Sequence, residues 1–206
     1  MSIKPTTKTD IANMALDLLN TENIGDLDNP TNNTERFLSR WYEHIKLTLL
    51  RKYNWGFAKS RAAILRVNTP IFEYTDAYKL PNDFVRFLEI VDYVELPGSK
   101  TYTIEGDKLL INMSGASSIN IKYIADIENV LFFDSLFVNL LISYLAEKAC
   151  YKFTMDKSLL AYIRRLIDED ERKAVSIFSQ ERPPKKIQIS RFSRARRLNM
   201  SSIERY

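Results

Sequence analysis

The sequence predicts an α+β fold: an antiparallel helical bundle with an inserted small antiparallel β domain and an extended C-terminal tail. Three observations predict it: helical periodicity of apolar residues at both ends of the chain, alternating strand patterns with turn residues in the middle, and a strongly basic final segment. The proportions of hydrophobic (45%) and charged (27%) residues are those of a globular protein. At 206 residues the chain is long enough to bury a core without disulfides.

Two helices are predicted in the first quarter of the chain. The first is expected to run from about Thr9 to Asn20, and Thr7 followed three residues later by Asp10 predicts its N-terminal cap. The second is expected to begin near Thr34 and to end at 54–56. Its predicted apolar face, at a 3.6-residue spacing, consists of Phe37, Trp41, Ile45, Leu49 and Tyr53.

A β-rich region is predicted next. The expected strands are Phe57–Arg66, Phe87–Glu95, Lys100–Ile104, Leu109–Asn112 and Ser118–Ile124. Gly106 is predicted to form the turn of a hairpin between the third and fourth strands. The last strand alternates apolar and polar residues, which indicates one solvated face.

Two more helices are predicted after this region. Asp134 is the expected N-cap of a helix ending near Phe153. Because this helix is apolar all round, we expect it to be buried on all sides, with part of its surface against a neighbouring subunit. The helix from about Asp156 to Gln180 is amphipathic, and its acidic run 168–171 is expected on a solvated face with i,i+4 ion pairs.

The last twenty-five residues differ in charge from the rest of the chain. They carry +7, and because the whole chain carries +4, the first 181 residues carry a net −3. The tail residues singled out are Arg182, Lys185, Lys186, Arg191, Phe192, Arg194, Arg196, Arg197 and Arg205. Three interpretations remain open: contact with nucleic-acid phosphates, docking along an acidic groove of a protein partner, or a solvated tail.

These patterns divide the chain into four parts. They are the first part of a helical domain (1–56), a β insertion (57–128), the second part of the helical domain (129–181) and a basic C-terminal extension (182–206).

The sequence contains no recognisable catalytic motif. H-E-x-x-H, C-x-x-C and G-x-S-x-G are all absent, and the five glycines are too scattered for a P-loop or a dinucleotide-binding loop. The only histidine, His44, and the only cysteine, Cys150, lie in apolar helical stretches and are interpreted as structural. We therefore expect no enzyme, no metal ion and no cofactor.

Several short motifs follow one another in a consistent order. They are Trp55-Gly56-Phe57-Ala58 with Arg61, then Tyr78-Lys79-Leu80-Pro81-Asn82-Asp83 with Arg86 and Ile90, then Glu105-Gly106 with Leu109-Leu110, Tyr123-Ile124, and Phe133-Asp134 with Phe137. This ordered set resembles the tail tubular protein A family of head-to-tail adaptors in short-tailed bacteriophages. The resemblance covers about residues 11–180, its most specific part is the Y-x-L-P-x-D segment, and the basic tail lies outside it.

We expect the motif residues to have structural roles. Trp55 and Phe57 are expected to pin the β insertion against the helices through aromatic burial. Pro81 is expected to hold Leu80 extended, and Asp83 to cap the turn before the next strand.

The resemblance implies a virion structural protein. Related adaptors form a ring, commonly dodecameric, that lies beneath the portal protein, extends the DNA channel and carries the tail nozzle or needle. In similar adaptors a C-terminal extension binds the portal, a role that Phe192 and the tail arginines would take here. Non-specific contact with genomic DNA is a further expectation.

The expected location is the neck or tail of the virion, after assembly in the host cytoplasm. The N-terminus lacks the pattern of a secretory signal, and the uncharged apolar run Ser135–Ala146 is too short to span a bilayer. We therefore expect no membrane partner. Two alternatives remain: a nucleic-acid-binding accessory protein acting through the tail, and a virion-associated hydrolase with two carboxylates converging in a cleft.

Overall fold

The structure is a computed structural model that describes residues 5–67, 72–91, 102–112 and 115–180. These residues form an α+β structure, as the sequence predicts, with four α-helices and two three-stranded antiparallel sheets, a division of the strands that was not predicted. The α-helices are α1 (Lys8–Asp17), α2 (Asn33–Lys52), α3 (Ser135–Phe153) and α4 (Lys157–Gln180). The strands are β1 (Lys59–Leu65), β2 (Asp76–Lys79), β3 (Phe84–Ile90), β4 (Tyr102–Glu105), β5 (Lys108–Ile111) and β6 (Ser118–Ala125). Two short 3₁₀ helices, η1 (Gly56–Ala58) and η2 (Val130–Phe132), precede β1 and α3.

Local capping chemistry sets the starts of the first three helices. The predicted Thr7–Asp10 capping box is present at α1, although that helix ends at Asp17, three residues earlier than expected. A second capping box joins Asn32 and Glu35 at the start of α2. Asp134 caps α3 by accepting a hydrogen bond from the Leu136 amide at 2.8 Å, which confirms that prediction.

The buried face of α2 differs from the predicted one by one position at its N-terminal end. Leu38 and Tyr42 are buried there, whereas the predicted core residues Phe37 and Trp41 are only half-buried. The 3.6-residue spacing is satisfied by either register, so periodicity alone does not distinguish them.

The helix α3 lies at the centre of the helical part, in contact with α1, α2 and α4. Ten of its side chains are buried, and these include Cys150. The prediction that this helix is buried is therefore confirmed for its middle, but Tyr151, Lys152 and Phe153 at its C-terminal end are exposed, so the helix is not buried on all sides. The expected contact of part of its surface with a neighbouring subunit stays a prediction.

The acidic run of α4 is only partly solvated, which corrects the expectation for 168–171. Asp168 and Glu169 are exposed, but Asp170 is buried and Glu171 faces the other helices. Glu171 accepts hydrogen bonds from Lys52 and, at 2.6 Å, from the hydroxyl of Tyr144. The helical period explains this, because positions 163, 167, 170 and 174 lie on the face of α4 that packs against α3.

The strands form two sheets with orders β1-β6-β3 and β2-β5-β4. The predicted hairpin is confirmed: β4 pairs with β5, and Gly106 takes a positive φ of 60° in the turn between them. The four-residue strand β2 was not predicted, and its last two residues, Tyr78 and Lys79, were assigned only to a motif. An isolated bridge between Arg66 and Tyr78 connects the two sheets.

Three predicted strand starts are wrong: β5 begins one residue early, at Lys108, and β1 and β3 differ by more. The residue Phe57 lies in η1, so β1 begins two residues later, at Lys59. The strand β3 begins at Phe84, three residues earlier than expected, and has register shifts along its pairing with β6. Of the predicted strand Phe87–Glu95, residues 92–95 lie outside the described part.

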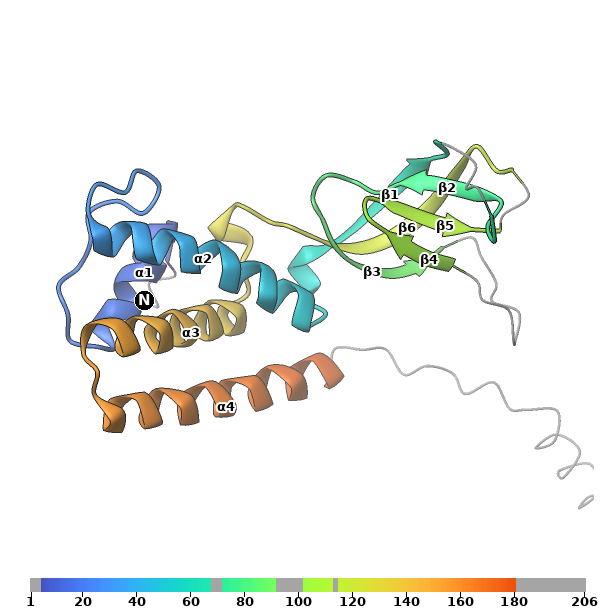
Figure 1. Ribbon diagram of the computed structural model, residues 1–206. Coiled ribbons are helices and arrows are strands. Elements are labelled where there is room, and N and C mark those ends of the chain that lie inside the picture. The colour runs from blue at the N-terminus through green and yellow to red at the C-terminus, as the bar shows by residue number, and fades with distance from the viewer. Residues whose placement is uncertain (1–4, 68–71, 92–101, 113–114, 181–206) are drawn as a thin grey trace, which may run out of the picture.

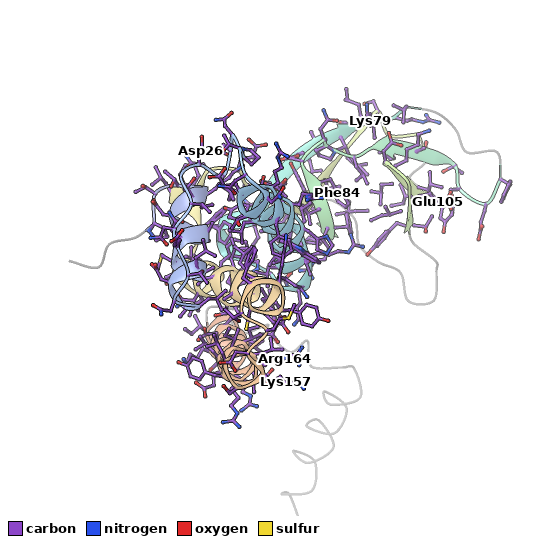
Figure 2. The ribbon with its side chains drawn as sticks, turned by 60° about the vertical axis from the view of Figure 1, so that its left-hand side comes forward. Asp26, Lys79, Phe84, Glu105, Lys157 and Arg164 are labelled. Carbon is purple, nitrogen blue, oxygen red and sulfur yellow. The ribbon has the colours of Figure 1, made fainter. Side chains whose placement is uncertain are left out.

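Two hydrophobic clusters organise these elements. One is formed mainly by the four helices, and the other lies between the two sheets. Figure 1 shows the helices together on one side and the strands on the other. In Figure 2, Phe84 lies on the side of the strands nearest the helices, and Lys79 and Glu105 lie farther out.

Candidate functional site

The structure does not test the predicted tail site. All nine residues singled out in the tail, from Arg182 to Arg205, lie outside the described residues. The interpretation of the tail therefore stays a prediction. The described residues do position the eight motif residues, and they reveal two exposed surfaces that the sequence analysis did not predict.

An aromatic cluster lies where the chain passes from α2 to β1. Trp55 is fully buried, and its indole nitrogen donates a hydrogen bond to the Leu49 carbonyl of α2 at 2.9 Å. The Phe137 ring of α3 lies 5.1 Å, between ring centroids, from both Trp55 and Phe57 in edge-on geometry. Phe133 completes the cluster, 4.9 Å from Phe137. Trp55 and Phe57 thus have the pinning position that was expected of them.

Arg86 forms a second link between the two parts. Its guanidinium donates to the Arg51 carbonyl at 2.8 Å and also to the side-chain oxygen of Asn54. The Arg51 guanidinium donates in turn to the Val85 carbonyl at 3.1 Å. Burial and the nearby charge of Arg51 lower the pKa of Arg86 below its usual range. The Arg86 side chain therefore binds backbone and side-chain groups at the C-terminal end of α2.

The Y-x-L-P-x-D segment contributes to the core between the sheets. Tyr78 and Leu80 are buried, and the Tyr78 hydroxyl donates to the Ala116 carbonyl at 2.7 Å. Asp83 does not act as the expected turn cap. Its carboxylate instead accepts from the Tyr123 hydroxyl of β6 at 3.1 Å and 3.2 Å. Burial, together with this carboxylate, raises the pKa of Tyr123 to about 12.

The remaining motif residues are at the surface. Pro81 is half-buried, and its carbonyl accepts a hydrogen bond from the Phe84 amide at 3.2 Å. Arg61 is exposed on β1 and lines a shallow hollow of about 380 Å³ with Lys122 of β6. The motif residues thus do not converge on one cleft. They are spread over the junction, the sheet core and the outer face of β1.

A larger groove lies at the far end of the helical part, where the C-terminal half of α3 meets α2 and α4. It encloses about 530 Å³. We call it the helix-end groove, and its lining consists of Phe37, Trp41, Glu147, Lys148, Tyr151, Lys152, Met155, Leu160 and Arg164. Tyr151 and Met155 are 74% and 78% exposed, so its apolar surface is open to solvent.

Cations surround the aromatic rings of this groove. The ammonium of Lys152 lies 4.2 Å from the centroid of the Phe37 ring, and that of Lys148 lies 5.2 Å from the centroid of Trp41. Arg164 pairs with Glu147 at 2.9 Å. Figure 2 shows Arg164 on α4. The lining therefore carries three cations and one carboxylate, which favours an anionic ligand.

A second exposed surface lies at η2, just before the N-terminus of α3. Leu131 and Phe132 are 55% and 65% exposed, whereas the flanking Val130 and Phe133 are buried. The 3₁₀ turn is closed by a hydrogen bond from the Phe133 amide to the Val130 carbonyl at 3.0 Å. We call Leu131 and Phe132 the η2 projection, because two buried side chains anchor two exposed ones.

Neither surface was predicted from the sequence. Phe37 and Trp41 were assigned to the core, and Leu131 and Phe132 were given no role of their own. One signal was available: Tyr151 and Met155 are large apolar residues close to the turn between two helices, where burial is hard to achieve.

Within the described ranges, no group of three or more His, Cys, Asp or Glu side chains is arranged to hold a metal ion. No helix in the part of the chain that the structure describes is both long and apolar enough to cross a membrane. In comparisons with known proteins, no protein-family model and no curated protein matches the chain.

Proposed function

We propose that this chain is a virion structural protein that forms a head-to-tail adaptor ring between the portal and the tail. In this proposal the ring extends the DNA channel and docks the tail nozzle or needle. The helices form an antiparallel bundle, the strands form an inserted domain, and the basic extension 182–206 binds the portal. Its role is assembly, without a catalytic step.

The contacts that the motif residues make within the chain support this proposal. Trp55 and Phe57 fill the junction between helices and strands, and Arg86 donates to the end of α2 across the same junction. Asp83, a carboxylate that could serve chemistry, accepts instead from the Tyr123 hydroxyl. The ordered motifs that resemble the adaptor family thus hold two structural parts together, as a rigid ring subunit requires.

The proposal is tested with the portal of the same phage. Full-length protein and a version truncated after Glu181 are compared by light scattering and negative-stain microscopy, each alone and with the portal. We expect full-length protein to decorate the portal as a ring and the truncated version to lose that binding. Full-length protein that stays monomeric and unbound in the presence of the portal would contradict the proposal.

A second candidate function is nucleic-acid binding through the tail. The observation that favours it is the charge of +7 in the last twenty-five residues, on a body of net −3. Binding through phosphates would weaken steeply as salt rises, because counterions are released from the nucleic acid. Measuring DNA affinity of both versions at several salt concentrations tests this, and negligible affinity of the full-length protein at low salt would exclude it.

A further inference from the structure

The helix-end groove and the η2 projection are both apolar at their centres and are bordered by charges of opposite sign. The groove is a concave apolar surface bordered by Lys148, Lys152 and Arg164. The projection presents two adjacent apolar side chains, and the exposed carboxylates of Glu128 and Asp134 lie within three residues of it in sequence. An aromatic anchor between carboxylates is the kind of ligand that an aromatic pocket between cations accepts.

The two surfaces lie at opposite ends of one helix. The η2 projection immediately precedes α3, and the groove is lined by the last two turns of that helix. With 19 residues, α3 separates them by about 28 Å. Figure 1 shows α3 running from the end that faces the strands to the turn where α4 begins. A projection therefore cannot fill the groove of its own chain.

We propose that the η2 projection of one copy docks into the helix-end groove of a second copy. This contact is heterologous, because it joins two different surfaces of the same protein. A pair of copies joined in this way keeps one free projection and one free groove at its outer ends. Repetition of the contact produces a closed ring when the rotation between copies closes, and a helical filament when it does not. The inference rests on the proposed ring and names the surfaces that would build it.

Charge complementarity favours a second copy as the occupant. Burying Phe132 against Phe37 and Trp41 removes apolar surface from water on both sides. Glu128 and Asp134 then approach Lys152 and Lys148, whose positive charges would otherwise repel one another. The basic tail 182–206 does not suit this groove, because it would add positive charge to a lining that is already positive.

The test uses two double variants that each remove one surface. The first, Leu131→Ser with Phe132→Ser, removes the projection, and the second, Tyr151→Ser with Lys152→Glu, removes the groove. Leu65→Ser with Phe72→Ser is the matched control, because this Leu and Phe are similarly exposed but lie in the β part. Thermal unfolding followed by circular dichroism establishes that each variant folds.

Association is measured by sedimentation velocity over a range of concentrations. We expect each surface variant alone to lose self-association by at least about tenfold, and the β-part control to behave like wild type. An equimolar mixture of the two surface variants should form dimers and nothing larger, because it contains exactly one intact projection–groove pair per two chains. Surface variants that assemble like wild type would overturn the docking, and so would a mixture that stays monomeric.

A cross-link detects the contact even when it is weak. Phe132→Cys and Met155→Cys are prepared as separate proteins, and the native Cys150 remains because it is buried. Under mild oxidation we expect a mixed disulfide dimer from the two variants together, well above the homodimers that each forms alone. Equal yields of mixed dimer and homodimers would contradict the proposal.

Failure of the docking and failure of the proposed function give different results. If wild-type protein forms rings and the surface variants form the same rings, the docking is overturned and the adaptor proposal is not. Wild-type protein that is monomeric with and without the portal, and that gives no mixed cross-link, overturns both. A groove that binds a portal or tail protein, yet gives no mixed cross-link, shows that its occupant is another protein.

Discussion

Arg86 of β3 donates a hydrogen bond to the carbonyl of Arg51 in the last turn of α2, at 2.8 Å. Carbonyl groups at the end of a helix lack intrahelical partners and carry the negative end of the helix dipole, so a guanidinium is a favourable cap. Arg51 donates back to the strand through the Val85 carbonyl. The two arginines thus connect a helix to a strand, because each guanidinium donates to a backbone carbonyl of the other element.

Replacing Arg86 with alanine should weaken this connection. The change leaves the Arg51 carbonyl and the Asn54 side chain without their donor, so we expect the free energy of unfolding to fall by about 1–3 kcal/mol. Urea denaturation measures the loss. Arg61→Ala is the matched control, because that arginine is exposed on β1, and it should change stability by less than about 0.5 kcal/mol. Equal losses in the two variants would argue against the linking role.

Lys46 provides a second prediction at the junction. Its side chain is buried, and its ammonium lies 2.8 Å from Glu43 and 2.9 Å from Asp126, which follows β6. Burial lowers the pKa of Lys46, but the hydrogen bonds to these carboxylates outweigh it and raise the pKa above its usual value. Because a hydrogen bond between charged groups is lost, Lys46→Met should destabilise the protein by about 1.5–3 kcal/mol.

A double-mutant cycle with Asp126→Asn isolates the pair. We expect the double variant to be less destabilised than the sum of the two single variants, since both remove the same interaction. Additive losses would show that Lys46 and Asp126 are not coupled.

The two tryptophans give an internal comparison. Trp55 is fully buried in the aromatic cluster, whereas Trp41 is half-buried in the helix-end groove. Trp55→Ala should therefore cost about 3–5 kcal/mol through the cavity that it leaves. Trp41→Ala should cost clearly less. Thermal and urea unfolding of both variants measure the difference, and a larger loss at Trp41 would contradict the assigned burial.

Glu35 predicts a specific dependence on pH. Its carboxylate accepts from the amides of Thr31 at 2.7 Å and Asn32 at 3.2 Å, and these bonds lower the pKa of Glu35 to about 2 from a usual value of 4.5. The ionised form is thus favoured in the folded protein. Its contribution to stability is complete above about pH 4.5 and is lost as the pH falls from there toward 2.

The variant Glu35→Gln tests this dependence. The stability difference between wild type and variant should be largest near pH 6 and should shrink as the pH falls from 5 toward 3. Glu22→Gln, at an exposed glutamate in the loop between α1 and α2, is the control. A difference that stays constant over that range would show that the charge of the Glu35 carboxylate does not stabilise its hydrogen bonds to Thr31 and Asn32.

Local signals predicted a large part of the fold. The α1 cap, the α3 cap and the hairpin at Gly106 were all predictable because each depends on a few neighbouring residues. The boundaries of β1 and β3 were wrong because they depend on pairing with β6, which is distant in sequence. The missed β2 has the same cause: its four residues are a strand only because β5 lies beside them.

The candidate surfaces could be predicted far less well. The sequence suggested which residues are apolar, but not which of two adjacent helical positions faces the core. Phe37 and Leu38 show the difficulty, because only the packing of α2 against α3 decides that Leu38 is buried and Phe37 borders a groove. Likewise, the exposure of Leu131 and Phe132 follows from how η2 is anchored and not from their hydrophobicity.

The pairing of Lys59 with Ile124 brings together the first and last strands of the β part. The chain therefore leaves the helices and returns to them through two adjacent points, although about 65 residues lie between. Such an arrangement makes the β part replaceable in evolution, since a longer, shorter or unrelated module fits wherever its two ends meet. Descendants of a common ancestor could therefore keep the helices while exchanging the module they carry, and so acquire new attachments without redesigning their core.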